Sequence, residues 1–186
     1  AVSLMLIGKE TVYRLHGFSG LGLHFAADGF GIILAVLTAA IWLFTTLFSK
    51  EYMAAEENRN RYYFFVFLTL GATMGIFLSA DLFTTFIFFE MMSFTSFVLV
   101  IHDEEAFTIR SAKTYLAVAV IGGLVTLMGL FMMYQKTGTL HMAELTAFMQ
   151  SQENPADFYL IGVLILFGFA AKAGLFPLHI WLPNAY

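Results

Sequence analysis

The chain has no cysteine, which excludes disulfides, thiol nucleophiles and thiolate metal sites from its 186 residues. Charge is also scarce: Asp, Glu, Lys and Arg make up 12% of the sequence, about half of their share in a soluble domain. The net charge of −4 is small and dispersed, so we expect no nucleic-acid partner. A Gly-rich phosphate loop and a nucleophilic triad are both missing, and we expect no cofactor and no redox chemistry in the chain itself.

We also expect no cleavable signal peptide at this start, because the first residues, "AVSLMLIGKE", have no basic region. They also lack an initiator Met, and we expect the chain to be a piece of a longer protein. Residues 1–8 would then be the tail of an earlier membrane span.

Long apolar runs are what the sequence has instead, with 60% hydrophobic residues, 22 Phe and 10 Met. A helix of about 20 apolar residues spans the hydrocarbon core of a bilayer. We therefore predict an all-α fold, a polytopic membrane helix bundle partnered by lipid. Its transmembrane unit would cover residues 30–176 and contain about five helices, at about 30–48, 62–79, 82–101, 111–134 and 155–176.

The connections between these helices carry recognisable start and turn signals. Only "SAD" joins the second and third helices, which predicts a tight antiparallel pair with Asp81 as N-cap. "ENPAD" predicts a helix start with Asn154 as cap and Pro155 at the first helical position. Residues 9–28 hold two β-prone runs around a Gly-rich turn and predict an extramembrane hairpin. Residues 139–152 predict a short interfacial amphipathic helix.

The loops give a weak signal for orientation, with five Lys and Arg residues on one side and three on the other. This bias places the loops after the first and third predicted helices in the cytoplasm. The start of the first helix would lie outside.

Glu90 is the only acidic residue deep within a predicted span, roughly 13 Å along the third helix. Its helical neighbours carry no positive charge: Phe86, Ile87, Ser93 and Phe94. A lone buried carboxylate takes up a proton. Glu90 is therefore either neutral and bonded to a hydroxyl such as that of Ser93, or partnered from another helix.

Lys172 is the only basic residue deep within a span, in "FGFAAKAGLFPLHIWLPNAY". A charge at the bilayer centre costs about 2.5–3.5 kcal/mol, and Pro177 removes a backbone donor and frees the Ala173 carbonyl. A broken helix at membrane depth is tolerated where it is buried in protein or lines a cavity. We predict that the last helix is broken at Pro177 and that Lys172 lies in a polar pocket; the alternative is snorkelling of Lys172 to an interface.

His179, just after the break, is a candidate for passing protons between this pocket and water, because imidazole titrates near neutral pH. The alternative is a histidine bonded to the freed backbone. His102 follows the third helix beside three acidic residues and is predicted to be solvated surface. His16, His24 and His141 fall in predicted loops without ligand spacing, so we expect no metal site.

Three segments resemble the antiporter-like proton-translocating subunits of respiratory complex I, Mrp-type antiporters and membrane-bound hydrogenases. "GFAAKAGLFPLHIWLPNAY" resembles the lysine-bearing broken helix of that superfamily, "DLFTTFIFFEMMSFTSFVLV" its glutamate helix, and "FAADGFGIILAVLTAAIWLFTTLFSKEYM" a preceding helix. Phe89 stands where the family often has Trp, and Tyr186 where it often has His.

The resemblance implies that the predicted helices are the third to seventh of the family, the first unit of an inverted five-helix repeat without its last helix. It implies that Glu90 pairs with Lys172 and that Lys172 is the central protonatable residue of one half-channel. Other membrane subunits would be the partners, and the location would be a bacterial or archaeal plasma membrane. Without the second half-channel, residues 1–186 alone would not carry protons across the membrane.

Three functions fit the sequence. The first is a proton-translocating subunit of a redox-driven complex, of the NADH:quinone oxidoreductase or hydrogenase type, with the redox chemistry in other subunits. The second is an Mrp-type antiporter subunit, in which the same pocket exchanges Na⁺ for H⁺. The third is a membrane anchor whose buried Glu–Lys pair only fixes helix packing.

Overall fold

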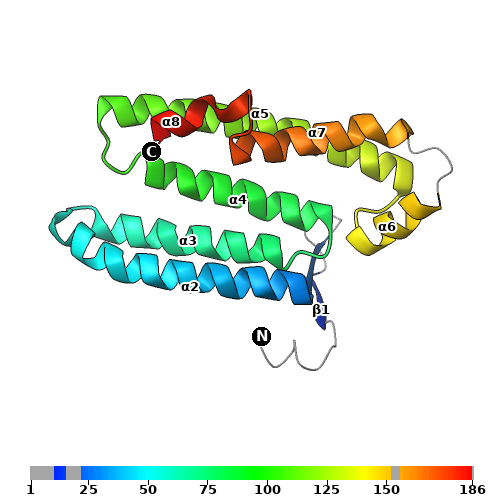
Figure 1. The fold of residues 1–186 in the computed structure, drawn as a ribbon, viewed down its shortest axis with the longest axis horizontal. Coiled ribbons are helices and arrows are strands. Elements are labelled where there is room, and N and C mark those ends of the chain that lie inside the picture. The colour runs from blue at the N-terminus through cyan, green and yellow to red at the C-terminus, as the bar shows by residue number, and fades with distance from the viewer. Residues whose placement is uncertain (1–10, 16–21, 152–155, 186) are drawn as a thin grey trace.

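The fold is a bundle of long helices with a β-hairpin at one end (Figure 1). The structure, a computed structural model, describes residues 11–15, 22–151 and 156–185. The long helices are α2 (Gly29–Tyr52), α3 (Arg59–Phe77), α4 (Leu82–Val100), α5 (Ala106–Thr137) and α7 (Ala156–Ala173). Shorter helical elements are η1 (Met53–Ala55), α6 (Met142–Gln150), η2 (Leu178–Trp181) and α8 (Leu182–Ala185). The predicted earlier span, His16, the cap at Asn154 and Pro155, and Tyr186 lie outside the described residues.

Four of the described helices, rather than the predicted five, are both long enough and apolar enough to cross a membrane. Those four lie in residues 29–55, 82–100, 106–137 and 156–181. Helix α3 is 19 residues long, but its first turn, Arg59 to Arg61, lowers its mean hydropathy. It nevertheless lies between α2 and α4 in the same bundle (Figure 1).

The bundle is apolar outside and carries hydroxyl groups inside, the reverse of a soluble protein. Large side chains such as Phe44, Phe48 and Phe131 are 60–76% exposed. The buried polar side chains include Thr69, Thr84, Thr85, Ser93, Thr95, Ser111 and Thr126. An apolar surface on this scale matches a lipid solvent rather than water. The predicted polytopic membrane helix bundle is therefore confirmed.

Helices α5 and α7 pack extensively against each other, with the main apolar cluster between them and α6 beside it. A Cβ added at Gly122 of α5 would lie 2.9 Å from the Cβ of Ala171 on α7, so the glycine permits close approach of the two helices. The cluster consists of Leu130, Leu140, Phe158, Ile161 and Ile165. Helix α4 packs on α5, α3 on α4, and α2 on α3.

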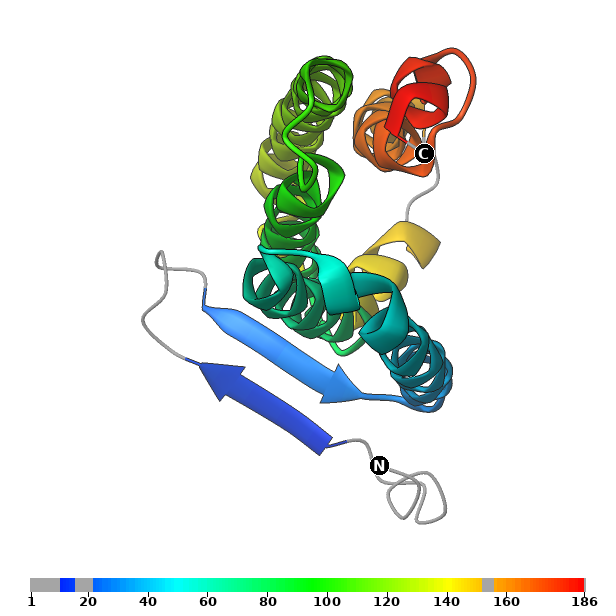
Figure 2. The ribbon, with the colours of Figure 1, turned by 90° about the vertical axis from the view of Figure 1, so that its left-hand side faces the viewer.

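The hairpin pairs β1 (Thr11–Leu15) with β2 (Leu23–Ala27) in antiparallel register, as the sequence predicts for residues 9–28. The hairpin lies at one end of the bundle (Figure 1), and Figure 2 shows its two strands running side by side next to the helices. Backbone bonds fix β2 to the turn between α3 and α4: the Ala26 amide donates to the Leu78 carbonyl, and the Ala80 amide to the His24 carbonyl, both at 2.8 Å. Asp81 caps α4, accepting from the Thr84 amide at 2.8 Å. The hairpin is thus attached to the helix that carries Glu90.

The interruption after α7 begins earlier than predicted. Helix α7 ends at Ala173, and Gly174 adopts a left-handed conformation with φ of 67°. The Leu175 amide donates to the Ala170 carbonyl at 3.0 Å, a glycine C-cap of the usual kind. Gly174 therefore ends the helix, and Pro177 lies in the segment that follows it. The prediction of a break at Pro177 rested on the missing proline donor and overlooked the glycine.

Candidate functional site

Glu90 projects from the middle of α4 toward α5. Its Oε1 atom is buried and makes no hydrogen bond. A Cβ added at Gly123 would lie 2.5 Å from this oxygen, so the absence of a side chain at Gly123 leaves room for the carboxylate. The Ser93 hydroxyl, one of the two expected partners, donates instead to the Phe89 carbonyl at 2.9 Å.

Lys172, in the last turn of α7, turns its ammonium group into the bundle. Its Nζ contacts the Tyr115 hydroxyl of α5 and donates to Ser96 Oγ of α4 at 3.2 Å. It also lies 4.4 Å from the centre of the Tyr115 ring, a cation–π contact. Three helices thus meet at one charge. The alternative of snorkelling is wrong, because the ammonium points at residues inside the bundle.

A short chain of hydroxyl groups continues from the ammonium. Ser96 Oγ and Tyr115 Oη lie 2.6 Å apart, and Tyr115 donates to the Ser93 carbonyl at 3.2 Å. Tyr115 is only 2% exposed. Neither hydroxyl was predicted from the sequence. Ser96 does lie six residues after Glu90 on the same helix, but Tyr115, near the start of a long apolar helix that also contains Tyr134, gives no comparable signal.

Glu90 and Lys172 do not form the direct ion pair that the resemblance implies. Among the described residues, ion pairs join His24 with Asp81, Arg61 with Glu104, and Lys136 with Asp157. Because Tyr115 and Ser96 hold the ammonium while the carboxylate lies against Gly123, the structure separates the two charges.

The segment after the break packs against the same residues. The Trp181 indole donates to the Ala171 carbonyl at 2.8 Å, and its ring lies edge-on to Tyr115 at 5.0 Å. Trp181 therefore closes one side of the Lys172 environment. The His179 ring packs against Phe176 at 5.6 Å, and its buried Nδ1 makes no hydrogen bond. No hydrogen bond between His179 and Lys172 is present in this part of the structure.

The prediction that His102 is solvated surface is correct only in part. His102 is half-buried, and its ring lies edge-on to Tyr62 of α3 at 5.6 Å. Its carbonyl accepts from Arg61 at 2.7 Å, while the same guanidinium contacts the Glu104 carboxylate. This contact and the positive charge of Arg61 hold the pKa of Glu104 below its usual range. Tertiary packing between α3 and the end of α4 covers part of the ring, including its Nδ1 atom, which the neighbouring acidic residues did not indicate.

A crevice of about 450 Å³ opens between α2, α3 and α4. Its lining residues are Ile41, Trp42, Thr45, Tyr62, Val66, Ser96, Leu99 and Val100. Ser96 thus belongs both to the crevice wall and to the hydroxyl pair that binds Lys172. The crevice leads to the lysine through one hydroxyl group.

Tyr115→Phe tests whether the hydroxyl pair matters for the lysine. The phenylalanine ring keeps the cation–π contact but removes an acceptor of the ammonium. A hydrogen bond to a charged group contributes about 1.5–3 kcal/mol, and about 1.4 kcal/mol changes a rate tenfold. If Lys172 carries protons, as the resemblance implies, we expect translocation in vesicles to fall about tenfold or more at normal expression. Thr114→Val, at the neighbouring position outside this network, should have no effect; equal rates for Tyr115→Phe and wild type would show that the hydroxyl is dispensable.

Comparison with known protein families gives a match over the second half of the chain. A family profile described as NADH:quinone oxidoreductase/Mrp antiporter, transmembrane, matches residues 79–186. A Na⁺/H⁺ antiporter subunit from Alkalihalophilus pseudofirmus is 32% identical, over 89% of this chain and 34% of its own length. The corresponding Na⁺/H⁺ antiporter subunit from Bacillus subtilis is 33% identical, with the same coverage. The chain therefore spans about a third of the length of these curated relatives.

Two solved structures share the fold. A chain of the membrane-bound sulfane sulfur reductase, an archaeal respiratory membrane complex, has a TM-score of 0.83 and 28% identity, covering 100% of this chain and 29% of its own length. A chain of the Mrp complex from Dietzia sp. DQ12-45-1b has a TM-score of 0.88 and 24% identity, covering 99% and 21%. The second likeness concerns the fold alone.

Proposed function

Because the chain belongs to the NADH:quinone oxidoreductase/Mrp antiporter transmembrane family, we propose that it forms one half-channel of an ion-translocating subunit, with Lys172 as the central proton carrier. It is a multi-pass membrane protein of the plasma membrane. The observation that carries the proposal is the position of Lys172. Its half-buried ammonium group is held by two hydroxyl groups beside a crevice, and the Glu90 carboxylate on α4 has no ion-pair partner in the described part of the chain.

In the proposed mechanism, protons reach Lys172 through the crevice and the hydroxyl groups of Ser96 and Tyr115. A hydroxyl both donates and accepts, so it can relay a proton to a neighbouring lone pair. Movement of the Lys172 side chain between these hydroxyls and the Glu90 carboxylate changes the stability of its charge. An opposite charge within about 4–6 Å stabilises the protonated lysine by about 1.4–4 kcal/mol. This energy is comparable with that needed to move one charge against a membrane potential of 100 mV, about 2.3 kcal/mol.

The relatives favour a Na⁺/H⁺ antiporter as the parent assembly. Both are named as subunits of such an antiporter and are 32–33% identical, so we place the antiporter ahead of the redox-driven complex that came first in the sequence analysis. The reductase chain, at 28% identity, supports the redox-driven complex as a second candidate. In either case other membrane subunits would be the partners, and the exchanged ions would be H⁺ and, for the antiporter, Na⁺.

The test measures proton movement in everted vesicles that contain the whole parent assembly. A proton gradient is established, and Na⁺ is then added while a pH-sensitive dye is monitored. An antiporter collapses the gradient when Na⁺ is added, and the collapse disappears in Lys172→Met. Proton uptake that depends on an electron donor and not on Na⁺ would favour the redox-driven complex. If the intact assembly gives neither response, the result contradicts ion translocation. The membrane anchor would then remain as the function.

A further inference from the structure

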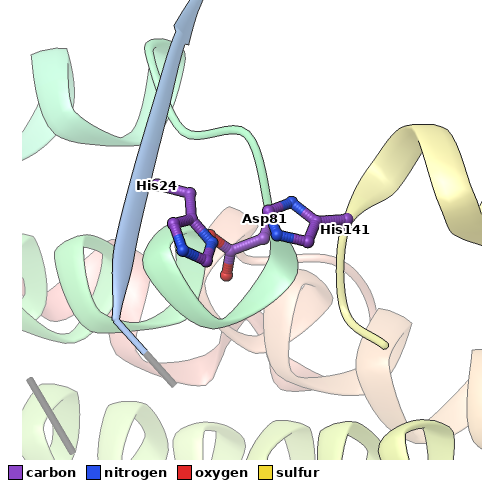
Figure 3. Close-up of side chains that lie close together, drawn as sticks. All are labelled: His24, Asp81 and His141. Atoms are coloured by element: carbon purple, nitrogen blue, oxygen red, sulfur yellow. The ribbon is translucent and has the colours of Figure 1, made fainter. Parts of the chain in front are cut away.

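A second polar cluster lies at the hairpin end of the bundle, away from Lys172. His24 of β2, Asp81 at the start of α4 and His141 before α6 each offer a ligand atom, and these atoms lie within 4.8 Å of one another (Figure 3). His24 Nδ1 is 3.3 Å from Asp81 Oδ2. The two imidazole rings are stacked with centres 4.4 Å apart.

Backbone pairing, not chance contact, fixes these three positions. Asp81 and His141 form an antiparallel bridge, in which the Leu82 amide donates to the Leu140 carbonyl at 2.9 Å. The His24 carbonyl accepts from the Ala80 amide on the other side. Three segments that are distant in sequence are therefore held in register around one carboxylate.

The carboxylate is already oriented by a neighbouring residue. Asp81 is 3% exposed, and its two oxygens accept from the Thr84 amide and the Thr84 hydroxyl at 2.8 and 2.6 Å. Each carboxylate oxygen has about two acceptor sites, so both keep a lone pair for another partner. Support of this kind, which orients a ligand from behind, is typical of metal sites.

We propose that His24, Asp81 and His141 bind a divalent ion of the zinc class. Two imidazoles and a carboxylate suit zinc and its neighbours rather than magnesium or calcium. Zinc bonds of about 2.0–2.1 Å in a tetrahedron separate ligand atoms by about 3.3 Å, which is the distance between His24 Nδ1 and Asp81 Oδ2. The ligand atoms lie within 4.8 Å of one another, so the His141 ring must turn out of its stack with His24 to bring the third ligand into range. A cavity of about 120 Å³ beside the cluster leaves space for water at the fourth position.

The bound ion would join the hairpin, the N-terminus of α4 and the connection between α5 and α6. The absence of a metal site was expected from sequence spacing alone, and spacing does not reveal ligands that meet through strand and bridge pairing. A simpler function for the cluster is a hydrogen bond from His24 to Asp81 with His141 stacked on it. Direct binding experiments distinguish the two.

The experiment uses the metal alone as the probe, on the purified parent assembly without a histidine tag and stripped with chelator. Co²⁺ titration should give the intense visible absorption of a tetrahedral site, and Zn²⁺ should displace it. His141→Asn should weaken binding at least about tenfold, since even partners behind the ligands contribute 10–100-fold. His141 is the N-cap residue of α6, a position that asparagine favours, so this variant should fold.

His24→Gln should weaken binding to a similar extent, whereas His102→Gln, at the opposite end of α4, should bind as wild type. Zn²⁺ should raise the unfolding temperature of the wild type and not that of His141→Asn. Undetectable binding at micromolar metal would overturn the proposal, as would equal binding by wild type and His141→Asn. If His24→Gln fails to assemble, the comparison of His141→Asn with wild type still tests whether the cluster binds the metal.

Discussion

Replacing Lys172 with methionine is expected to abolish ion translocation while the protein still assembles in the membrane. Methionine has nearly the same length but carries no proton, and removing a buried charge does not destabilise a membrane helix. Translocation is measured as dye-monitored proton movement in vesicles, with expression checked by immunoblot. Lys113→Met, which removes an exposed lysine of α5, is the matched control and should translocate normally.

Lys172→Arg distinguishes a proton carrier from a fixed charge. Guanidinium keeps the charge and can donate to Ser96 and Tyr115, but it does not release its proton. We therefore expect this variant to be inactive as well. Normal translocation by the arginine variant would mean that Lys172 only provides a fixed positive charge. Protons would then travel by another route, such as His179 and water.

Glu90→Gln is the second change with a large expected effect. Glutamine is nearly isosteric, so the contact with Gly123 is preserved and assembly should be normal. If the Lys172 ammonium moves toward the Glu90 carboxylate during each cycle, loss of that charge removes about 1.4–4 kcal/mol of stabilisation. That energy corresponds to a fall in rate of about tenfold or more.

The same vesicle assay measures the effect, and Glu105→Gln, an exposed carboxylate before α5, is the control. An unchanged rate in Glu90→Gln would contradict a role for the carboxylate in translocation. If Glu90→Gln keeps the wild-type rate and Glu90→Ala fails to assemble, the role of Glu90 is in helix packing.

The long helices, the hairpin and the two charged residues within the spans could all be predicted from the sequence. Apolar runs, the Asp81 cap and the β-prone segments depend on neighbours in the chain, and the structure has each of them. Glu90 and Lys172 were detectable because each stands alone in an apolar helix. The motifs around them also indicated the family that the profile match confirms. The predicted end of α7 was three residues too late, at Phe176 rather than Ala173, because a glycine that adopts the left-handed conformation, Gly174, ends the helix before Pro177.

Which side chains meet could not be predicted in this way, because it depends on how the elements pack. Tyr115 and Ser96 reach Lys172 because three helices pack with particular rotations about their axes, and helical periodicity does not fix those rotations relative to one another. His24 and His141 reach Asp81 through strand pairing and a β-bridge. In the same way, the separation of Glu90 from Lys172 follows from a glycine at position 123 and a tyrosine hydroxyl on another turn of α5. The hydrophobicity of the sequence determines how deep a residue lies in the membrane, whereas the packing of helices and strands determines which side chain it contacts.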